Sequence, residues 1–226
     1  MYDIVFISYN EPNADANWEL VKYRFPRAKR VDGVKGIHQA HIAAAKKCFT
    51  KMFWVVDADA KILDSFKFDH KVDEYDLETV HVWRSRNPVN DLLYGYGGVK
   101  LLPRKLTLNM DTTKPDMTTS ISEYFKAMPE TSNVTAFNTN EFEAWKGAFR
   151  ECTKLASNII DHNKQVDDAY RLEVWCTRGE NRRYGDYALT GAQQGRDFGT
   201  HYKGNTDALR NINDWNWLKE KFNEAI

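Results

Sequence analysis

The sequence has no excess of charge of either sign and few cysteines. Its 226 residues hold 32 basic and 32 acidic side chains. A protein held to nucleic acid mainly by bulk charge usually shows a basic excess, so this balance argues against that class, although it allows a local basic patch. Cys48, Cys152 and Cys176 lie far apart and form no C-x-x-C pair. This argues against a disulfide framework or a structural zinc site and favours a reducing, cytoplasmic compartment.

Long apolar runs are also missing. No stretch approaches the roughly 20 apolar residues that a membrane-spanning helix needs. No signal-peptide pattern precedes residues 2–6, which already have the composition of a strand. We therefore expect a soluble protein with no membrane partner. Hydrophobic residues make up 42% and charged residues 28% of the chain, a globular composition long enough for a real core.

Strand and helix patterns alternate in the first hundred residues. Short apolar runs predict strands at residues 4–7, 27–31 and 52–56. Apolar residues at three- and four-residue steps predict helices after Asn13 and from Gly36. This alternation predicts an α/β sheet with parallel strands.

The rest of the chain changes character. Further strands are expected at residues 79–83 and 98–102, whereas 107–135 is polar and is interpreted as a loop. From Asn140 onward the pattern is mainly helical, with one helix expected to end at Gly195. The expected organisation is an α/β domain at 1–110 followed by a mainly helical region at 111–226.

Asp57, Ala58 and Asp59 follow directly after a predicted strand and carry the strongest chemical signal in the chain. In open α/β sheets, ligands bind at the carboxyl ends of the parallel strands. Two carboxylates this close repel each other unless a cation lies near them. Mg2+ and Mn2+ prefer oxygen ligands and bridge phosphates. The motif therefore predicts a metal held on a diphosphate, with a solvated acidic turn as the alternative.

In their order of elements, residues 2–104 resemble the GT-A fold of glycosyltransferases. That fold is a nucleotide-binding mixed sheet flanked by helices, with a D-x-D motif after a central strand. The resemblance implies a metal-dependent hexosyl- or pentosyltransferase that uses a nucleotide-sugar donor, with UDP as the default nucleotide, and a hydroxyl acceptor. In this resemblance Asp57 serves both the donor and the metal, and Asp59 serves the metal.

The resemblance also implies roles at the nucleotide. Ser8, Tyr9 and Asn10 end the first strand, where the nucleoside is held. Asp32 ends the second strand, where a carboxylate commonly reads the base. Lys35 would lie near the diphosphate, beside a helix N-terminus that favours anions. The alternatives are a core-closing role for Tyr9 and a solvated loop position for Lys35.

A second resemblance lies near the end of the chain. The H-Y-K-G sequence at 201–204 is similar to the H-x-x-G segment of glycosyltransferases related to glycogenin and the bacterial galactosyltransferases. It implies that His201 is the third protein ligand of an Mn2+ or Mg2+ ion. In those enzymes a lysine beyond the glycine contacts the diphosphate. Asn205 follows the glycine here, so Lys203 is the candidate for that contact.

Two further segments fall where such enzymes place donor and acceptor groups. Gly97 and Gly98, just before a predicted strand, would lie against the donor sugar, because glycine allows close backbone approach. A tight turn or a bulge is the alternative. Asp116 would be the catalytic base of an inverting enzyme. A retaining enzyme needs no such base, and Asp116 would then bind sugar hydroxyls. The alternative to both roles is a helix cap or a turn residue.

The acceptor is suggested by arginines and by phage-like segments. The helical region is rich in arginine, at Arg171, Arg178, Arg182, Arg183, Arg196 and Arg210. Residues 149–155 and 195–199 look similar to segments of bacteriophage-encoded proteins of the glycosyltransferase type. This resemblance implies phage DNA with hydroxymethylated bases as a candidate acceptor, reached by base flipping. The alternative is a solvated helix face.

Two other functions compete with this interpretation. A nucleotidyltransferase can use the same α/β half, metal and nucleotide, but it normally has a glycine-rich basic stretch after the first strand. A non-enzymatic nucleic-acid-binding module would make the Asp pair incidental. His38 and His41 are three residues apart on one helix, and packing is favoured over a metal pair there.

Overall fold

Short runs of β-branched and aromatic residues form the strands of this protein, whose computed structural model describes residues 1–159 and 165–225. The strands are β1 (Asp3–Ser8), β2 (Lys29–Asp32), β3 (Met52–Asp57), β4 (Ala60–Ile62), β5 (Val80–Arg86), β6 (Leu93–Pro103) and β7 (Phe125–Thr135). The helices are α1 (Ala14–Arg24), α2 (Ile37–Lys46), α3 (Arg104–Leu108), α4 (Met117–Ile121), α5 (Glu141–Ser157), α6 (Gln165–Thr177), α7 (Gly185–His201), α8 (Thr206–Arg210) and α9 (Trp215–Ala225). Two 3-10 turns are η1 (Glu74–Asp76) and η2 (Asn211–Asn213).

The chain divides into two compact units. The first contains Met1–Asn87, Leu93–Thr112 and Met117–Ala136. The second contains Pro88–Leu92, Thr113–Asp116 and the described part of Phe137–Ile226. The first unit holds the sheet and the second holds the long helices, so the expected α/β class with a mainly helical C-terminal region is confirmed at that level.

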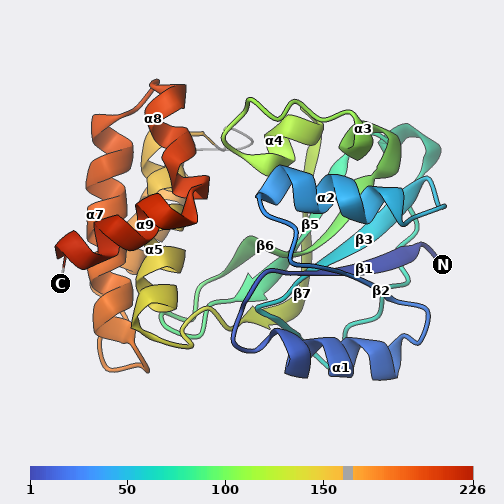
Figure 1. Ribbon diagram of the computed structural model, residues 1–226, viewed down its shortest axis with the longest axis horizontal. Helices are drawn as coiled ribbons and strands as arrows, with labels where there is room; N and C mark the ends of the chain where they lie inside the picture. Colours follow the sequence, from blue (N-terminus) through green and yellow to red (C-terminus); the bar gives the residue numbers. More distant parts are fainter. Residues whose placement is uncertain (160–164, 226) are drawn as a thin grey trace. The chain divides into compact units, whose positions relative to one another are not determined.

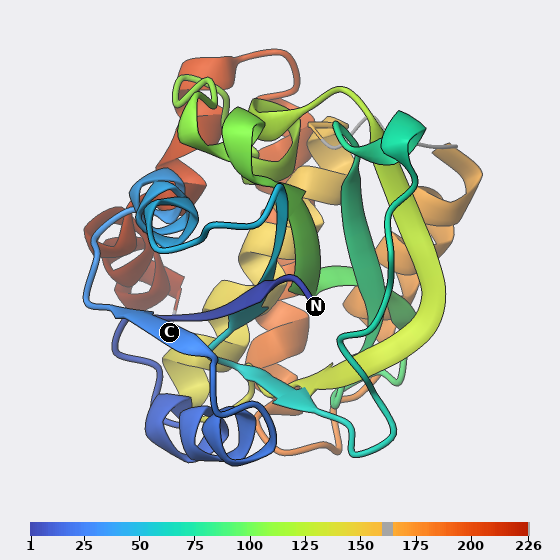
Figure 2. The ribbon, with the colours of Figure 1, turned by 90° about the vertical axis from the view of Figure 1, so that its right-hand side faces the viewer.

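All seven strands of the first unit form one mixed sheet in the order β2-β1-β3-β6-β5-β7-β4. β2, β1 and β3 are parallel, as predicted from their alternation with helices. β6 runs antiparallel to both β3 and β5, and β7 is parallel to β5. The sheet curls strongly, and the long β7 strand curves along it (Figure 2).

Helices cover both faces of this sheet, because successive residues of a buried strand point to opposite sides. On one face Phe6 and Trp54 pack with Val21 of α1. On the other face Val55 packs with Ala44 of α2. Figure 1 shows α1 and α2 on opposite sides of the strands. The parallel strands are therefore buried on both faces, which explains their almost continuous apolar sequences.

The polar stretch at residues 107–135 is not a loop, and that interpretation was wrong. It contains α4 and the whole of β7, an 11-residue strand. Much of β7 is exposed, and it includes Pro129 and Glu130, so its sequence has little strand propensity. Pairing with β5 and β4 forms this strand, and through it the first unit extends to Ala136.

In the second unit, α5 and α7 pack unusually closely because of three glycines. Gly191, Gly195 and Gly199 recur every fourth residue of α7 and face the backbone of α5. A Cβ atom on Gly195 would overlap the carbonyl oxygen of Phe149. The hydroxyl of Thr153 also donates to the Gly195 carbonyl at 3.1 Å. The prediction that the helix ends at Gly195 was wrong: the glycine is a packing position, and α7 continues to His201.

Aromatic residues fill the core of this unit beside the glycine contact. Trp145 and Phe149 stack with ring centroids 4.8 Å apart, and both are almost fully buried. Ile212, Leu218 and Phe222 complete the cluster from the last part of the chain. The predicted start of α5 is confirmed, since the side chain of Asn140 accepts from the backbone amide of Glu143 at 2.8 Å. Within the described residues, no helix is both long enough and apolar enough to cross a membrane.

Candidate functional site

The carboxyl ends of the three parallel strands bring the predicted nucleotide-binding residues to one edge of the first unit. Ser8 is the Cα partner of Asp32, and Ile7 is the partner of Asp57. Polar groups from three separate stretches of sequence therefore meet where open α/β sheets bind ligands.

Ser8, Arg30 and Asp32 form a hydrogen-bonded cluster at this edge. Ser8 is buried, and its hydroxyl donates to Oδ1 of Asp32. Arg30 donates from Nε to the Ser8 hydroxyl at 2.9 Å and from Nη2 to the same Asp32 oxygen at 3.3 Å. Its other nitrogen donates to Asp15 of α1 at 2.7 Å. Because both bonds to Asp32 use Oδ1, its second oxygen has no partner among the described residues.

The turn formed by Asp57, Ala58 and Asp59 is held through its backbone. The buried amide of Asn17 in α1 donates to the Ala58 carbonyl at 2.7 Å. The backbone amide of Ala136 donates to the Asp59 carbonyl, also at 2.7 Å. One carbonyl of the turn is thus bonded to a helix and the other to the residue that follows β7, so neither is left without a donor. The motif therefore connects β3 and β4 by a turn in which the Ala58 and Asp59 carbonyls are both hydrogen-bonded.

Asp57 has a cationic partner that sequence reasoning missed. The ammonium of Lys100 donates to its two carboxylate oxygens at 2.8 Å and 2.7 Å, and also to the Gly97 carbonyl. Lys100 is 2% exposed. The available signal was a lysine within the apolar run at 99–102, because a buried charge needs a partner. The repulsion between the two aspartates is thus relieved by a lysine on the neighbouring strand.

Gly97 and Gly98 lie inside β6, which begins at Leu93 and not at the predicted position 98. The pairing with β5 is irregular here, and Gly97 has a positive φ of 79°. A Cβ on Gly98 would lie 2.7 Å from the side-chain nitrogen of Asn133 and 3.1 Å from Cβ of Ala60. The bulge alternative therefore describes this segment. Contact with a donor sugar stays a prediction.

His41 of α2 lies within electrostatic reach of Asp57 and Lys100. Its Nδ1 bonds to the carbonyl of Ile37 at 2.7 Å and therefore carries the proton. Nε2 is buried, with no partner in the described part of the chain. Burial, together with the nearby Lys100 charge, lowers the pKa of His41 from 6.5 to about 4. His38 is also buried and contacts the Ser120 hydroxyl at 3.1 Å, so both histidines are packed in the interior, as favoured from the sequence.

We expect the free energy of unfolding to fall as the pH is lowered from 6.5 towards 4. Folded His41 has the lower pKa, so in this window the unfolded chain binds more protons than the folded one. The contribution of His41 is complete above pH 6.5 and is lost towards pH 4, a total of about 3 kcal/mol. Urea unfolding of the wild type and of His41→Gln, measured at pH steps, checks this slope.

The exposed His201 supplies the control, since His201→Gln should keep the wild-type slope. Burial also lowers the pKa of His81, which adds its own slope to every variant. The informative quantity is therefore the difference in pH slope between the wild type and each variant. Equal slopes for the wild type and His41→Gln would contradict the prediction.

The other nucleotide-side residues lie near the same strand ends. Tyr9 is half-buried, and its backbone amide donates to the carboxylate of Glu11 at 2.5 Å. Asn10 has a positive φ of 63° in the turn after β1. Lys35 is exposed in the loop before α2. Ligand contacts for all three stay predictions.

Asp116, His201 and Lys203 belong to the second unit. Asp116 is 4% exposed and pairs with Lys154 at 3.1 Å. His201 is exposed at the last position of α7, and its ring packs against Tyr202. Lys203 is exposed two residues later. The roles predicted for these residues as base, metal ligand and diphosphate contact stay predictions.

A metal at the Asp57–Asp59 turn would need further ligands from a bound molecule. Among the described residues, no three His, Cys, Asp or Glu side chains are grouped so as to hold an ion by themselves. Mg2+ at a phosphate usually needs only one or two carboxylates and takes its other ligands from phosphate oxygens and water. Asp59, at the end of the turn, is the first candidate to hold such an ion.

Comparison with protein-family models and with curated proteins finds no match to this chain.

Proposed function

We propose that this protein is a metal-dependent glycosyltransferase of the GT-A kind, which moves a sugar from a nucleotide-diphosphate donor to a hydroxyl acceptor. The observation that carries the proposal is the clamped Asp57–Asp59 turn, which lies at the same sheet edge as the Ser8–Asp32 cluster. One polar cluster is suited to a nucleoside and the other to a charged diphosphate. Their neighbouring strands would hold the two parts of one ligand.

The nucleoside end is assigned to Ser8, Tyr9 and Asp32. Arg30 and Ser8 orient Asp32 through one of its oxygens and leave the other for a base or ribose donor. Tyr9 follows Ser8 directly at the end of β1, and its ring would stack on the base. A carboxylate oriented in advance loses little freedom when the ligand binds, which favours affinity.

The diphosphate end is assigned to Asp57, Asp59 and Lys100. A bound Mn2+ or Mg2+ supplies charge neutralisation on the departing diphosphate. Asp59 would hold that ion, and Lys100 fixes the orientation of the Asp57 carboxylate. UDP is the default nucleotide.

The acceptor side is assigned to Asp116 and to the arginine-rich helices. Asp116 would act as base in an inverting reaction, but its 4% exposure means that the surrounding side chains would have to open first. Phage DNA with hydroxymethylated bases remains the candidate acceptor. Three of the six arginines, Arg171, Arg182 and Arg196, are paired with carboxylates, which reduces the charge available for DNA phosphates.

Thermal unfolding with nucleotides tests the proposal directly. We expect UDP-, GDP- or CDP-linked sugars to raise the melting temperature in the presence of Mn2+, with a smaller rise when EDTA replaces the metal. A ligand at 100 times its dissociation constant adds about 2.7 kcal/mol to the stability. Stabilisation by nucleoside triphosphates alone would favour a nucleotidyltransferase. No response to any nucleotide would favour a non-enzymatic module, and either result would overturn the proposal.

A further inference from the structure

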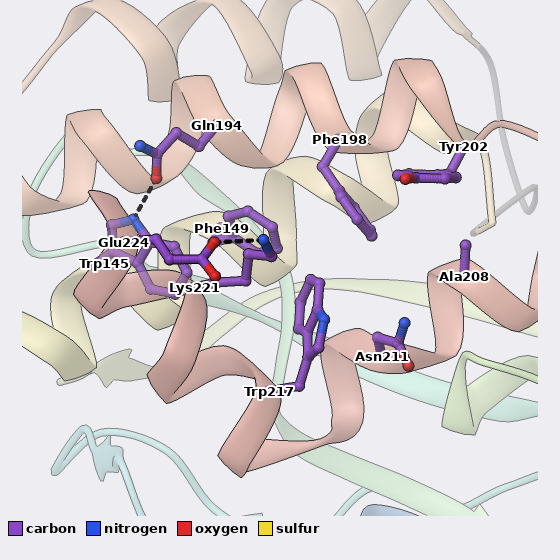
Figure 3. A pocket seen from close by; sticks show the side chains of 10 residues that line it. All are labelled: Trp145, Phe149, Gln194, Phe198, Tyr202, Ala208, Asn211, Trp217, Lys221 and Glu224. Carbon is purple, nitrogen blue, oxygen red and sulfur yellow. Dashed lines mark hydrogen bonds and ion pairs between the residues drawn. The ribbon is translucent and has the colours of Figure 1, made fainter. Parts of the chain in front are cut away.

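The second unit contains a pocket of about 450 Å3 that is separate from the sheet edge. It is formed by residues of α5, α7, α8, η2 and α9 (Figure 3). This volume is within the range of about 300–1,000 Å3 found for small-molecule sites. The pocket belongs to one compact unit, so its shape depends on the helices of that unit alone.

Aromatic rings make its floor and walls. The stacked pair Trp145 and Phe149 is almost fully buried at the floor. Phe198, Tyr202 and Trp217 are half-buried and keep part of their ring surface exposed. The centroids of Phe198 and Trp217 are 5.3 Å apart, and Figure 3 shows both rings between α7 and α9. A ligand would therefore meet the rings of Phe198, Tyr202 and Trp217 first.

Four polar groups among these rings have no hydrogen-bond partner within the described chain. Oε1 of Gln194 accepts from Nε1 of Trp145 at 2.7 Å, which leaves the amide nitrogen of Gln194 uncommitted. The side-chain amide of Asn211, the hydroxyl of Tyr202 and Nε1 of Trp217 are likewise unpaired. These groups offer both donors and acceptors at the rim of an aromatic surface.

The charge of the pocket narrows the class of ligand. Its lining contains one cation and one anion, Lys221 and Glu224, and these form an ion pair with each other (Figure 3). A nucleotide or a nucleic-acid backbone would require uncompensated basic groups. A purely apolar ligand would cover the uncommitted donors and acceptors without replacing their bonds to water, which is costly.

A neutral sugar meets these conditions. The C–H bonds on one face of a pyranose form an apolar surface that lies flat on an aromatic ring, and its hydroxyl groups project from the edge. We propose that this pocket binds a neutral carbohydrate, with one sugar ring stacked on Trp217 and its hydroxyl groups bonded to the side chains of Asn211, Gln194 and Tyr202. The site needs neither metal nor donor, so this inference does not rest on the proposed transferase activity.

The experiment uses the whole chain and a panel of neutral probes. Methyl glycosides and disaccharides of glucose, galactose, mannose and N-acetylglucosamine are titrated while tryptophan fluorescence and saturation-transfer NMR are recorded. We expect at least one probe to bind saturably. Trp217→Ala should weaken that binding by about tenfold or more, since a ring that anchors a ligand carries much of the affinity.

Two variants keep the result interpretable. Asn211→Ala changes an exposed residue, so it should fold normally and still weaken binding. Tyr170→Ala removes an aromatic ring that is 55% exposed and outside the pocket, and it should bind like the wild type.

Absence of saturable binding by every probe would overturn the proposal. So would equal affinity in the wild type, Trp217→Ala and Asn211→Ala, or binding at this pocket of UDP or a short oligonucleotide in preference to sugars. The two proposals also fail separately, because Asp59→Asn should leave the carbohydrate affinity unchanged. If the nucleotide response were absent while sugar binding was intact, only the transferase proposal would be contradicted.

Discussion

Replacing Asp59 with Asn is expected to lower the turnover of the sugar nucleotide by at least about 100-fold, because the variant would lose a carboxylate ligand of the metal that neutralises the departing diphosphate. The amide keeps nearly the same shape, and the bond between the Ala136 amide and the Asp59 carbonyl involves only the backbone. The variant should therefore keep this backbone bond of the turn and unfold in one cooperative transition without ligand. Release of the nucleoside diphosphate, measured with Mn2+ present, gives the turnover. Calorimetry without ligand gives the unfolding transition.

Two variants separate the loss of chemistry from the loss of folding. Asp64→Asn removes an exposed carboxylate a few residues further along the chain and should keep full activity. Asp57→Asn should lose activity and stability together, because it leaves the buried ammonium of Lys100 without its anion. The Asp57 side chain is 35% exposed, so the stability lost should be below the roughly 3–5 kcal/mol of a fully buried pair. Full turnover by Asp59→Asn would contradict the assignment of Asp59 as a metal ligand.

Replacing Gly195 with Leu is expected to lower the stability of the second unit by about 3 kcal/mol or more, since the new side chain would enter the space of the Phe149 carbonyl. Backbone atoms cannot move aside as a flexible side chain can, so α5 and α7 would have to separate. That movement would also open the contacts that Gly191 and Gly199 make with the same helix. Loss of the near-ultraviolet signal of the buried tryptophans, followed during urea unfolding, measures the effect.

Thr200→Leu supplies a matched control on the same helix. Thr200 is exposed, so the same new side chain should change the stability by no more than about 0.5 kcal/mol. Equal urea midpoints for Gly195→Leu and Thr200→Leu would show that the close helix contact does not stabilise the protein.

Local patterns predicted the elements that are stabilised by their own residues. The apolar runs of β1 and β3 and the capped start of α5 have the expected positions, within a few residues. β7 could not be predicted in this way, because its polar residues become a strand only by pairing with β5 and β4. Gly195 was misread for a similar reason: glycine commonly ends a helix, and only the neighbouring α5 makes it a packing position.

The candidate site shows the same difference between what local sequence predicts and what long-range contacts add. The sequence by itself determined that Asp57 and Asp59 follow a buried strand and that Ser8 and Asp32 end its neighbours, because the alternation of strands and helices is a local property. Only the tertiary structure decided that Lys100, 43 residues away, would pair with Asp57. It also decided that Asn17 and Ala136 would hold the acidic turn between them. Long-range pairs of this kind depend on the register of the strands and on helix placement, which no sequence window contains.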